Sequence, residues 1–156
     1  MKQRILGQNG PKVSVVGYGA MSFTDFYGRA TDEGSMQVLD ACLEFGINHV
    51  DTSNVYGMGR SETVIGEWLK RRGGECPFTI ATKGACTRDD ARTWGVDARP
   101  ERLNRRINNS LRRLEVERID LYQLRDIFFH LRRRSCITAV SSTGTLELRK
   151  QCIIVF

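Results

Sequence analysis

The sequence predicts an α/β fold in which parallel strands alternate with helices. Apolar runs with strand character and segments with helical periodicity follow one another in the order strand, helix, strand, helix, strand, helix, strand. This alternation is typical of parallel strands joined by right-handed helical crossovers. The length of 156 residues suits one domain with a substantial core and is short for two.

The amino-terminal segment carries a turn signal between two short apolar stretches. Asn9 and Gly10 tolerate positive φ, which predicts a small hairpin over Ile5–Val15. Val13–Gly17 is then expected to form the first buried strand.

Start and stop signals place three helices along the chain. Thr31 is a good N-cap for the first helix, and Gly46 ends it. Ser61 begins the second helix, and Pro100 suits the first turn of the third. The later strands are expected in Ile47–Val50, "CPFTIATKG" and "IDLYQL".

The chain is basic, with 24 Lys and Arg against 18 Asp and Glu and a net charge of +6. Such a balance suggests nucleic acid as a partner. However, the arginines gather in Arg99–Arg118 and Arg132–Arg134 without interleaved aromatic residues or a reading motif. We interpret them as the solvated face of a helix and expect no nucleic acid partner.

Other function classes lack their usual sequence signals. No apolar run approaches the ~18 residues of a membrane span, and no apolar stretch follows the basic start, so neither a membrane nor a secretory signal is expected. The five cysteines are scattered and show no metal-ligand spacing. This pattern favours reduced thiols in the cytoplasm and predicts no metal site.

The stretch "GYGAMS", Gly17–Ser22, nearly matches the glycine fingerprint of dinucleotide-binding folds. Ser22 replaces the third glycine, and no helix begins directly afterwards, although a pyrophosphate site needs that helix N-terminus. These glycines are expected instead to let the backbone bend close to a ligand at the carboxyl edge of the sheet.

Three ionisable residues fall at the carboxyl ends of expected strands, where parallel α/β folds bind their ligands. Asp51 follows the second strand, Tyr56 lies in the loop after it, and Lys83 ends the third strand. A buried lysine is costly unless it is paired, so we expect Asp51 to hold Lys83 beside the phenol. A nearby cation favours the phenolate and makes tyrosine a usable proton donor. Taken singly, the same residues also fit a buried ion pair and a loop tyrosine.

The segments around these residues resemble the aldo-keto reductases. "GINHVDTSNVYGMGRSETVIGEWL" is similar to the segment that carries that family's catalytic tyrosine, and "IATKG" is similar to its lysine strand. "RPERLNRRINNSLRRLEVERIDLYQL" resembles its third helix and fourth strand, and "LGQNGPKVSVVGYGAMSF" its N-terminal hairpin and first strand. The resemblance covers about Arg4 to Leu124.

The resemblance implies a (β/α)8 TIM barrel, truncated here to about its first four strand–helix units, with NADPH bound across the carboxyl face. Hydride passes to the carbonyl carbon of an aldehyde or ketone while a tyrosine protonates the oxygen. Tyr56 resembles the general acid, Lys83 the cation that acidifies it, and Asp51 the anchor of the lysine. The implied cofactor-binding residues are Gly19, Ala20, Met21 and Asp51.

The resemblance ends at Leu124. The family's fourth strand ends with a histidine that binds the substrate carbonyl, whereas Arg125 follows Leu124 and cannot act as a neutral imidazole donor. His130 is not expected to replace it, because a barrel site tolerates little misplacement. His49 is expected to be a packed interior residue.

Residues 1–126 are therefore expected to form the N-terminal half of the barrel, and residues 127–156 an unrelated, poorly ordered tail. The tail has short candidate strands at Thr138–Ser141 and Cys152–Phe156. Such barrels run to ~250 residues, so we interpret the chain as a truncated or misspliced product with weakened NADPH binding. Its open strand edges predict self-association.

Three functions remain open from the sequence. The favoured one is an aldo-keto reductase-like oxidoreductase with impaired or absent turnover. The second is a pseudo-enzyme or interaction module that pairs with another barrel half, and the third is a basic nucleic-acid binder acting through the third helix.

Overall fold

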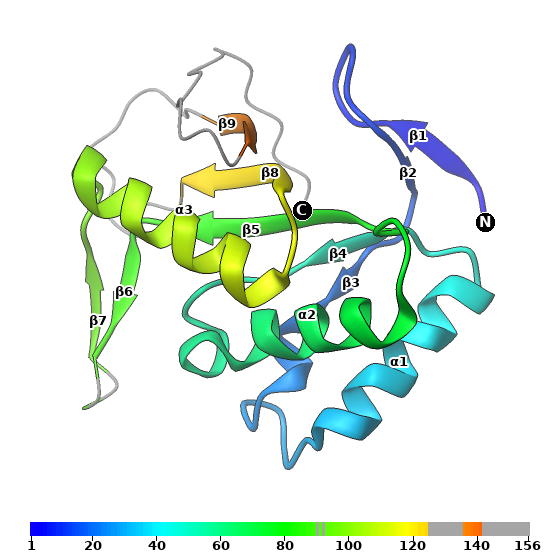
Figure 1. The fold of residues 1–156 in the computed structure, drawn as a ribbon, viewed down its shortest axis with the longest axis horizontal. Coiled ribbons are helices and arrows are strands. Elements are labelled where there is room, and N and C mark those ends of the chain that lie inside the picture. The colour runs from blue at the N-terminus through cyan, green and yellow to red at the C-terminus, as the bar shows by residue number, and fades with distance from the viewer. Residues whose placement is uncertain (90, 92, 125–135, 142–156) are drawn as a thin grey trace.

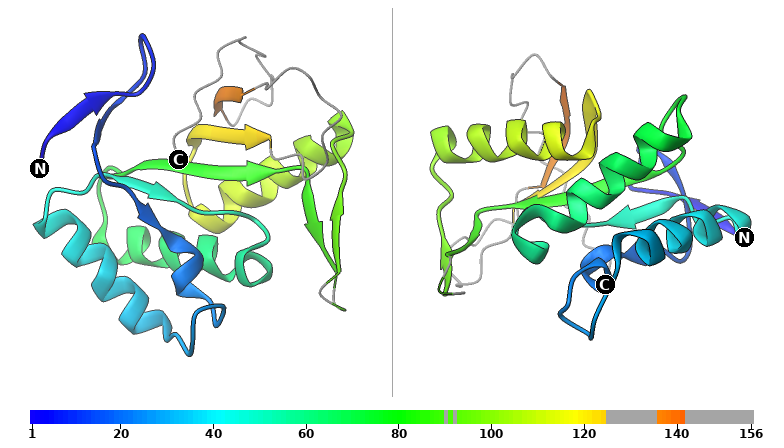
Figure 2. Two further views of the ribbon diagram at one scale, coloured as in Figure 1. Left: turned by 180° about the vertical axis from the view of Figure 1, so that it is seen from behind. Right: turned by 60° about the horizontal axis from the view of Figure 1, so that its bottom comes forward.

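A computed structural model describes residues 1–89, 91, 93–124 and 136–141. One five-stranded sheet has the order β3-β4-β5-β8-β9, and helices α1, α2 and α3 form a layer along it (Figures 1 and 2). Helix α2 packs between α1 and α3. The expected alternation of strands and helices is confirmed, and this α/β layer positions the candidate site.

The main sheet contains β3 (Tyr18–Gly19), β4 (His49–Asp51), β5 (Thr79–Gly84), β8 (Arg118–Leu124) and β9 (Cys136–Ser141). The helices are α1 (Asp32–Glu44), α2 (Arg60–Arg72) and α3 (Pro100–Leu114), with short 3-10 helices η1 (Ala20–Phe23) and η2 (Tyr56–Gly59). Two hairpins pair β1 (Gln3–Ile5) with β2 (Lys12–Ser14) and β6 (Cys86–Arg88) with β7 (Trp94–Val96).

The central strands run parallel, as predicted, and their register aligns their carboxyl ends at one edge of the sheet. Gly19 of β3 lies opposite Asp51 of β4, and Asp51 lies opposite Ala81 of β5. Lys83 of β5 lies opposite Gln123 of β8. The carboxyl ends of the parallel strands therefore meet at one edge, where such sheets bind their ligands.

The predicted hairpin near the amino terminus is confirmed, but the predicted first strand is misplaced. Val13 belongs to β2, and the first strand of the main sheet is the short β3, which begins at Tyr18. The backbone N–H of Val15 donates to the carbonyl of Lys2, so this apolar run extends the hairpin instead of entering the sheet. The side chains of Val15 and Val16 are consequently exposed.

The edge beyond β8 carries a strand of opposite direction. β9 pairs with β8 in antiparallel register, with Thr138 opposite Leu121, and it includes the strand expected at Thr138–Ser141. The other strand expected in the tail, Cys152–Phe156, and the boundary at residue 126 lie outside the described residues. The expected open edges of a half-barrel are thus β3 and β9 within the described part of the chain, because β9 covers β8.

Local signals explain where the first two helices begin. Thr31 caps α1 as predicted, because its hydroxyl accepts from the N–H of Gly34 at 3.1 Å. Helix α2 begins at Arg60, one residue before the predicted Ser61. Its N-cap is Gly59 in the left-handed region with φ of 98°, and no side chain caps this helix end. The hydroxyl of Ser61 is therefore available for another contact.

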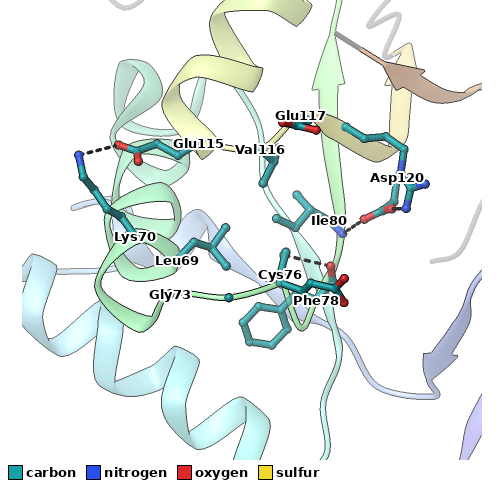
Figure 3. Close-up of a pocket in the computed structure, with 13 residues that line it drawn as sticks. Leu69, Lys70, Gly73, Cys76, Phe78, Ile80, Glu115, Val116, Glu117 and Asp120 are labelled. Atoms are coloured by element: carbon teal, nitrogen blue, oxygen red, sulfur yellow. Dashed lines mark hydrogen bonds and ion pairs between the residues drawn. The ribbon is translucent and has the colours of Figure 1, made fainter.

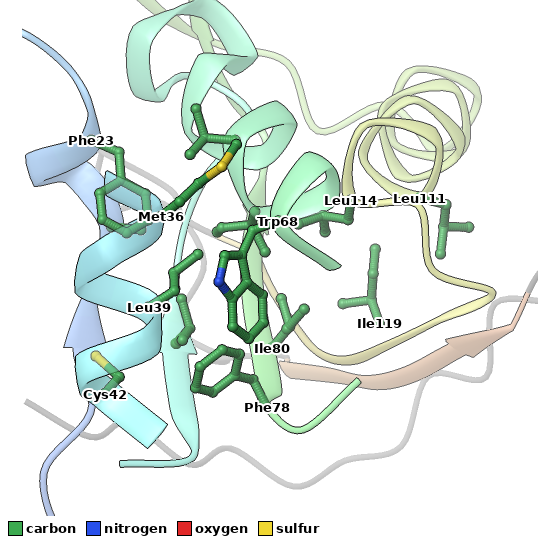
Figure 4. Packing of buried hydrophobic residues seen from close by; sticks show 14 of the residues in the cluster. Phe23, Met36, Leu39, Cys42, Trp68, Phe78, Ile80, Leu111, Leu114 and Ile119 are labelled. Atoms are coloured by element: carbon green, nitrogen blue, oxygen red, sulfur yellow. The ribbon is translucent and has the colours of Figure 1, made fainter. Parts of the chain in front are cut away.

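The main core fills the space between the helix layer and the sheet (Figure 4). Leu39 of α1, Ile65 of α2 and Ile80 of β5 are almost completely buried. Trp68 packs on Phe78 with 5.3 Å between ring centroids. Burying each such side chain contributes about 1.5–3 kcal/mol, so this core fixes α2 against the strands.

The arginines of helix α3 were predicted to form only a solvated face, and this prediction is wrong for Arg113. Its apolar stripe is buried as expected, with Leu103, Ile107 and Leu114 in the interior. However, the guanidinium of Arg113 donates to the carboxylate of Glu62 at 2.7 Å, and Glu62 is 0% exposed. The other Glu62 oxygen accepts from the hydroxyl of Thr82 at 2.6 Å. Charge on α3 therefore neutralises a buried acid of α2.

Replacing Arg113 with methionine should destabilise the fold by about 3–5 kcal/mol, because it leaves the Glu62 carboxylate buried without its counter-charge. Arg112→Met is the matched control, since the Arg112 guanidinium donates to Asn109 on the exposed side of the same helix. Urea unfolding of both variants measures the difference. A loss below about 1 kcal/mol for Arg113→Met, the size of an exposed pair, would contradict a buried ion pair.

Tyr122 carries a hydroxyl that is buried without a hydrogen-bond partner among the described residues. A Cβ at Gly84 would lie 2.2 Å from that hydroxyl oxygen, so only glycine fits opposite it. Burial, and then the charge of Glu62, raise the pKa of Tyr122 far above its ordinary value, which keeps the phenol neutral.

Tyr122→Phe should therefore preserve or raise stability, because it removes an unsatisfied buried hydroxyl that costs about 1–3 kcal/mol. Thermal unfolding with a urea titration measures this change. A loss of more than about 1 kcal/mol would show that the hydroxyl has a partner, such as a buried water.

Candidate active site

The carboxyl edge of the sheet gathers the three ionisable residues that the sequence singles out. Asp51 is the last residue of β4, and Lys83 precedes the final residue of β5. Tyr56 begins η2, the short helix between β4 and α2. These neighbouring strands and their loop bring the carboxylate, the ammonium and the phenol together.

The ammonium of Lys83 is held by two oxygen atoms. Its Nζ lies 2.5 Å from Oδ2 of Asp51 and donates to the backbone carbonyl of Thr52 at 2.8 Å. The Lys83 side chain is 6% exposed, while that of Asp51 is 34% exposed. The charge of the lysine is thus buried and paired, and its carboxylate partner remains open to the edge of the sheet.

The same ammonium faces the ring of Tyr56. Nζ of Lys83 lies 5.0 Å from the centroid of the phenol ring, within the range of a cation–π contact. A cation at this position stabilises negative charge on a phenol, so the arrangement can support proton donation by a tyrosine.

A left-handed loop fixes Tyr56 at the edge. Gly57, Met58 and Gly59 have φ values of 57°, 56° and 98°, and Met58 adopts this region although it has a side chain. A Cβ at Gly57 would lie 2.8 Å from Cγ2 of Thr24, so the loop passes close to the segment after η1. The chain therefore turns sharply after Tyr56 and enters α2.

The predicted cofactor-binding residues lie at the end of β3, next to Asp51. Gly19 is exposed, and a Cβ there would meet nothing within 4 Å. Ala20 is fully buried, and Met21 is half-buried. The space over Gly19 is therefore open, and the partly exposed Asp51 carboxylate lies beside it.

The histidines do not join these residues in the described part of the chain. His49 lies at the opposite, amino end of β4, and its Nδ1 is 3.0 Å from the carbonyl of Thr79. It is half-buried and packs closely on Gly17, so the predicted interior position is only partly reached. Arg125 and His130 lie outside the described residues.

Sequence reasoning missed the residues that support this cluster. Thr52 and Ser61 are fully buried, and their hydroxyl oxygens lie 2.9 Å apart. The hairpin of β6 and β7 was also not predicted, although it follows β5 directly and borders the carboxyl edge of the sheet. The hydroxyl of Thr52, next to Asp51, was the available signal, because a buried hydroxyl needs a partner.

A separate groove of about 830 Å³ lies at the other end of the sheet (Figure 3). It is bordered by the start of β8, the start of β5 and the ends of α2 and α3. Its polar contacts include the ion pair of Lys70 with Glu115 and the bond from Ile80 N–H to Asp120. None of Asp51, Tyr56 and Lys83 lines this groove, so it is distinct from the candidate site.

The fold is that of an α/β protein with a parallel sheet, and comparisons with known proteins identify its family. The model of the aldo/keto reductase family matches residues 15–147, and the chain belongs to this family. The match runs past the predicted boundary at residue 126, which itself stays a prediction.

Relatives and solved structures agree with this assignment. The uncharacterized oxidoreductase YqkF of Bacillus subtilis is 34% identical over 125 residues, covering 80% of this chain and 39% of that protein. The aldo-keto reductase yakc of Schizosaccharomyces pombe, whose name specifies NADP(+), is 31% identical and covers 70% of this chain and 33% of that protein. The holo form of an aldo-keto reductase from Bacillus halodurans superposes with a TM-score of 0.69 at 34% identity, over 80% of this chain and 40% of that one.

The predicted barrel-type fold is confirmed by these matches. The neighbours are aldo-keto reductases of the TIM-barrel type. The chain spans about two fifths of the length of the relatives that it matches. Within the described ranges, no helix has the length and apolar character needed to cross a bilayer.

The paired burial of Lys83 predicts unequal costs for its two partners. Asp51→Asn should destabilise the protein more than Lys83→Met, because the first leaves a buried ammonium without its carboxylate and the second leaves a carboxylate that water can reach. Chemical denaturation of both single variants and the double variant measures the order. Equal losses that simply add in the double variant would contradict a coupled pair.

Proposed function

We propose that the chain carries the proton-donating part of an aldo-keto reductase site, which reduces aldehydes and ketones to alcohols with NADPH. The observation that supports this most strongly is the position of the Lys83 ammonium, bound to Asp51 and facing the ring of Tyr56. A structural ion pair alone does not require a phenol beside the ammonium at the ligand-binding edge of the sheet.

In this proposal each member of the cluster has one task. Tyr56 donates its phenolic proton to the carbonyl oxygen of the substrate as negative charge develops there. Lys83 stabilises the phenolate that remains. Asp51 orients the lysine, and the carbonyl of Thr52 fixes the second direction of the ammonium.

The proposed cofactor is NADPH. Gly19, Ala20, Met21 and Asp51 would hold it along the end of β3, where Gly19 leaves open space. When bound, the cofactor supplies the hydride that reaches the carbonyl carbon. Support comes from the family, from the NADP(+) in the name of the yeast relative and from the holo form of the Bacillus neighbour.

A second candidate is a module that pairs with another barrel half and does not turn over. The sequence places Arg125 directly after Leu124, where the family resemblance implies a histidine, and an arginine cannot donate as a neutral imidazole. The edges of β3 and β9 are open to pairing within the described sheet. In this alternative, the cluster persists as a relic of the reductase site.

The proposed compartment is the cytoplasm. Cys42 and Cys76 are free thiols in the described part of the chain. Burial raises the pKa of the Cys42 thiol, which keeps this thiol protonated.

Aldehyde-dependent oxidation of NADPH, followed by the loss of its absorbance, tests the first candidate. Tyr56→Phe should lower the rate by about 10²–10⁴-fold, because the ring remains and only the proton donor is lost. Fluorescence titration of NADPH should give similar affinities for both proteins. An unchanged rate in Tyr56→Phe would contradict the role of Tyr56.

The turnover assay together with light scattering separates the two candidates. Stoichiometric pairing on light scattering, without turnover by the wild type, would favour the pairing module. Turnover that depends on Tyr56 would exclude that module as the sole function.

A further inference from the structure

A chain of hydrogen bonds connects Lys83 to helix α2 through Thr52 and Ser61. The side chains of Thr52 and Ser61 have no role in the proposed chemistry. Oγ of Ser61 donates to the carbonyl of Ala20 at 2.7 Å and lies 2.9 Å from Oγ1 of Thr52. All three residues are 0% exposed. Because the single proton of Ser61 goes to Ala20, its oxygen must accept the proton of Thr52. The hydroxyl chain therefore has one direction.

Thr52 connects this chain of hydrogen bonds to the ammonium of Lys83. Its backbone carbonyl accepts from Nζ of Lys83 at 2.8 Å, and its N–H donates to the carbonyl of Ala81 at 2.8 Å. The peptide groups on both sides of Thr52 are thus tied to β5, while its side chain is tied to α2 through Ser61. The direction of the carbonyl that receives the lysine depends on both attachments.

Ser61 can make this contact because the helix does not use it as a cap. Gly59 is the N-cap, and Ser61 lies in the first turn with its side chain toward the sheet loops. The next residue, Glu62, contacts Thr82 of β5 and Arg113 of α3. The first turn of α2 therefore contacts both the loop that directly follows Asp51 of β4 and the strand β5, which carries Lys83.

We propose that Ser61 is a positioning residue of the site: it fixes the carbonyl of Thr52 and the loop of Ala20, and so sets where the Lys83 ammonium lies beneath Tyr56. Its effect on reduction rests on the proposed function, whereas its effect on the ammonium does not. The Ser61 hydroxyl is closed to solvent, so its removal takes from the buried Thr52 hydroxyl the acceptor that it has here.

The test measures the hydrogen exchange of the Lys83 ammonium protons by 15N NMR. Ser61→Ala should speed this exchange by about tenfold, because the Thr52 carbonyl is then less well oriented. Thr52→Val, which keeps the carbonyl and removes the hydroxyl, should have the same effect. Thr52→Ser keeps the hydroxyl and should restore slow exchange.

Ser35→Ala is the matched control. Ser35 is also a buried serine in the first turn of a helix, and its hydroxyl donates to the carbonyl of Thr31 at 2.8 Å within its own helix start. Exchange at Lys83 should not change in this variant. Wild-type exchange in both Ser61→Ala and Thr52→Val, or equal acceleration in Ser35→Ala, would overturn the positioning role.

The readout also separates this inference from the proposed function. If the wild type reduces aldehydes, Ser61→Ala should lower kcat while KM changes little, because the substrate contacts are intact. If the wild type has no turnover, faster exchange at Lys83 in Ser61→Ala still supports the positioning role. If Ser61→Ala does not fold, Thr52→Val and its serine counterpart decide the question alone.

Discussion

The burial of one ammonium group constrains the rest of this structure. Lys83 ends inside the protein, and a charged amine there requires oxygen partners that water does not supply. Asp51 provides one, from the adjacent strand, and the Thr52 carbonyl provides the other. Both depend on the parallel register of β4 with β5, because a slip of one residue would turn the lysine to the helix layer. The register of β4 with β5 therefore determines the geometry of the site.

Helix α2 connects that register to the core. Its first turn bonds to the loop after β4 through Ser61 and to β5 through Glu62, while Ile65 and Trp68 of the next turns pack in the interior. The close approach of Gly66 to the backbone of Arg113, where a Cβ would lie 2.1 Å from its carbonyl oxygen, sets the spacing of α2 and α3. The polar contacts near the site and the apolar packing behind it thus stabilise the same helix position.

Much of this arrangement could be predicted from the sequence, because its signals are local. Thr31 predicts the start of α1 because its side chain can cap a helix, and Asp51 and Lys83 lie at the ends of apolar runs. The errors concern choices made over long sequence distances. Val15 is as apolar as a core strand residue, yet its N–H is taken by Lys2 of the hairpin. Arg113 looks like its solvated neighbours, and only its distance to Glu62, 51 residues away, reveals its role. The direction of β9 likewise depends on tertiary pairing.

The central claim is that the Lys83 ammonium lies against the ring of Tyr56 while Asp51 holds it. The most direct measurement is a nuclear Overhauser experiment between the Lys83 Cε protons and the Tyr56 ring protons in the isotopically labelled chain. The account predicts clear cross-peaks that weaken when Asp51 is replaced by asparagine. A well-folded chain without these cross-peaks would contradict it, because the phenol would then lie away from the cation that is meant to activate it.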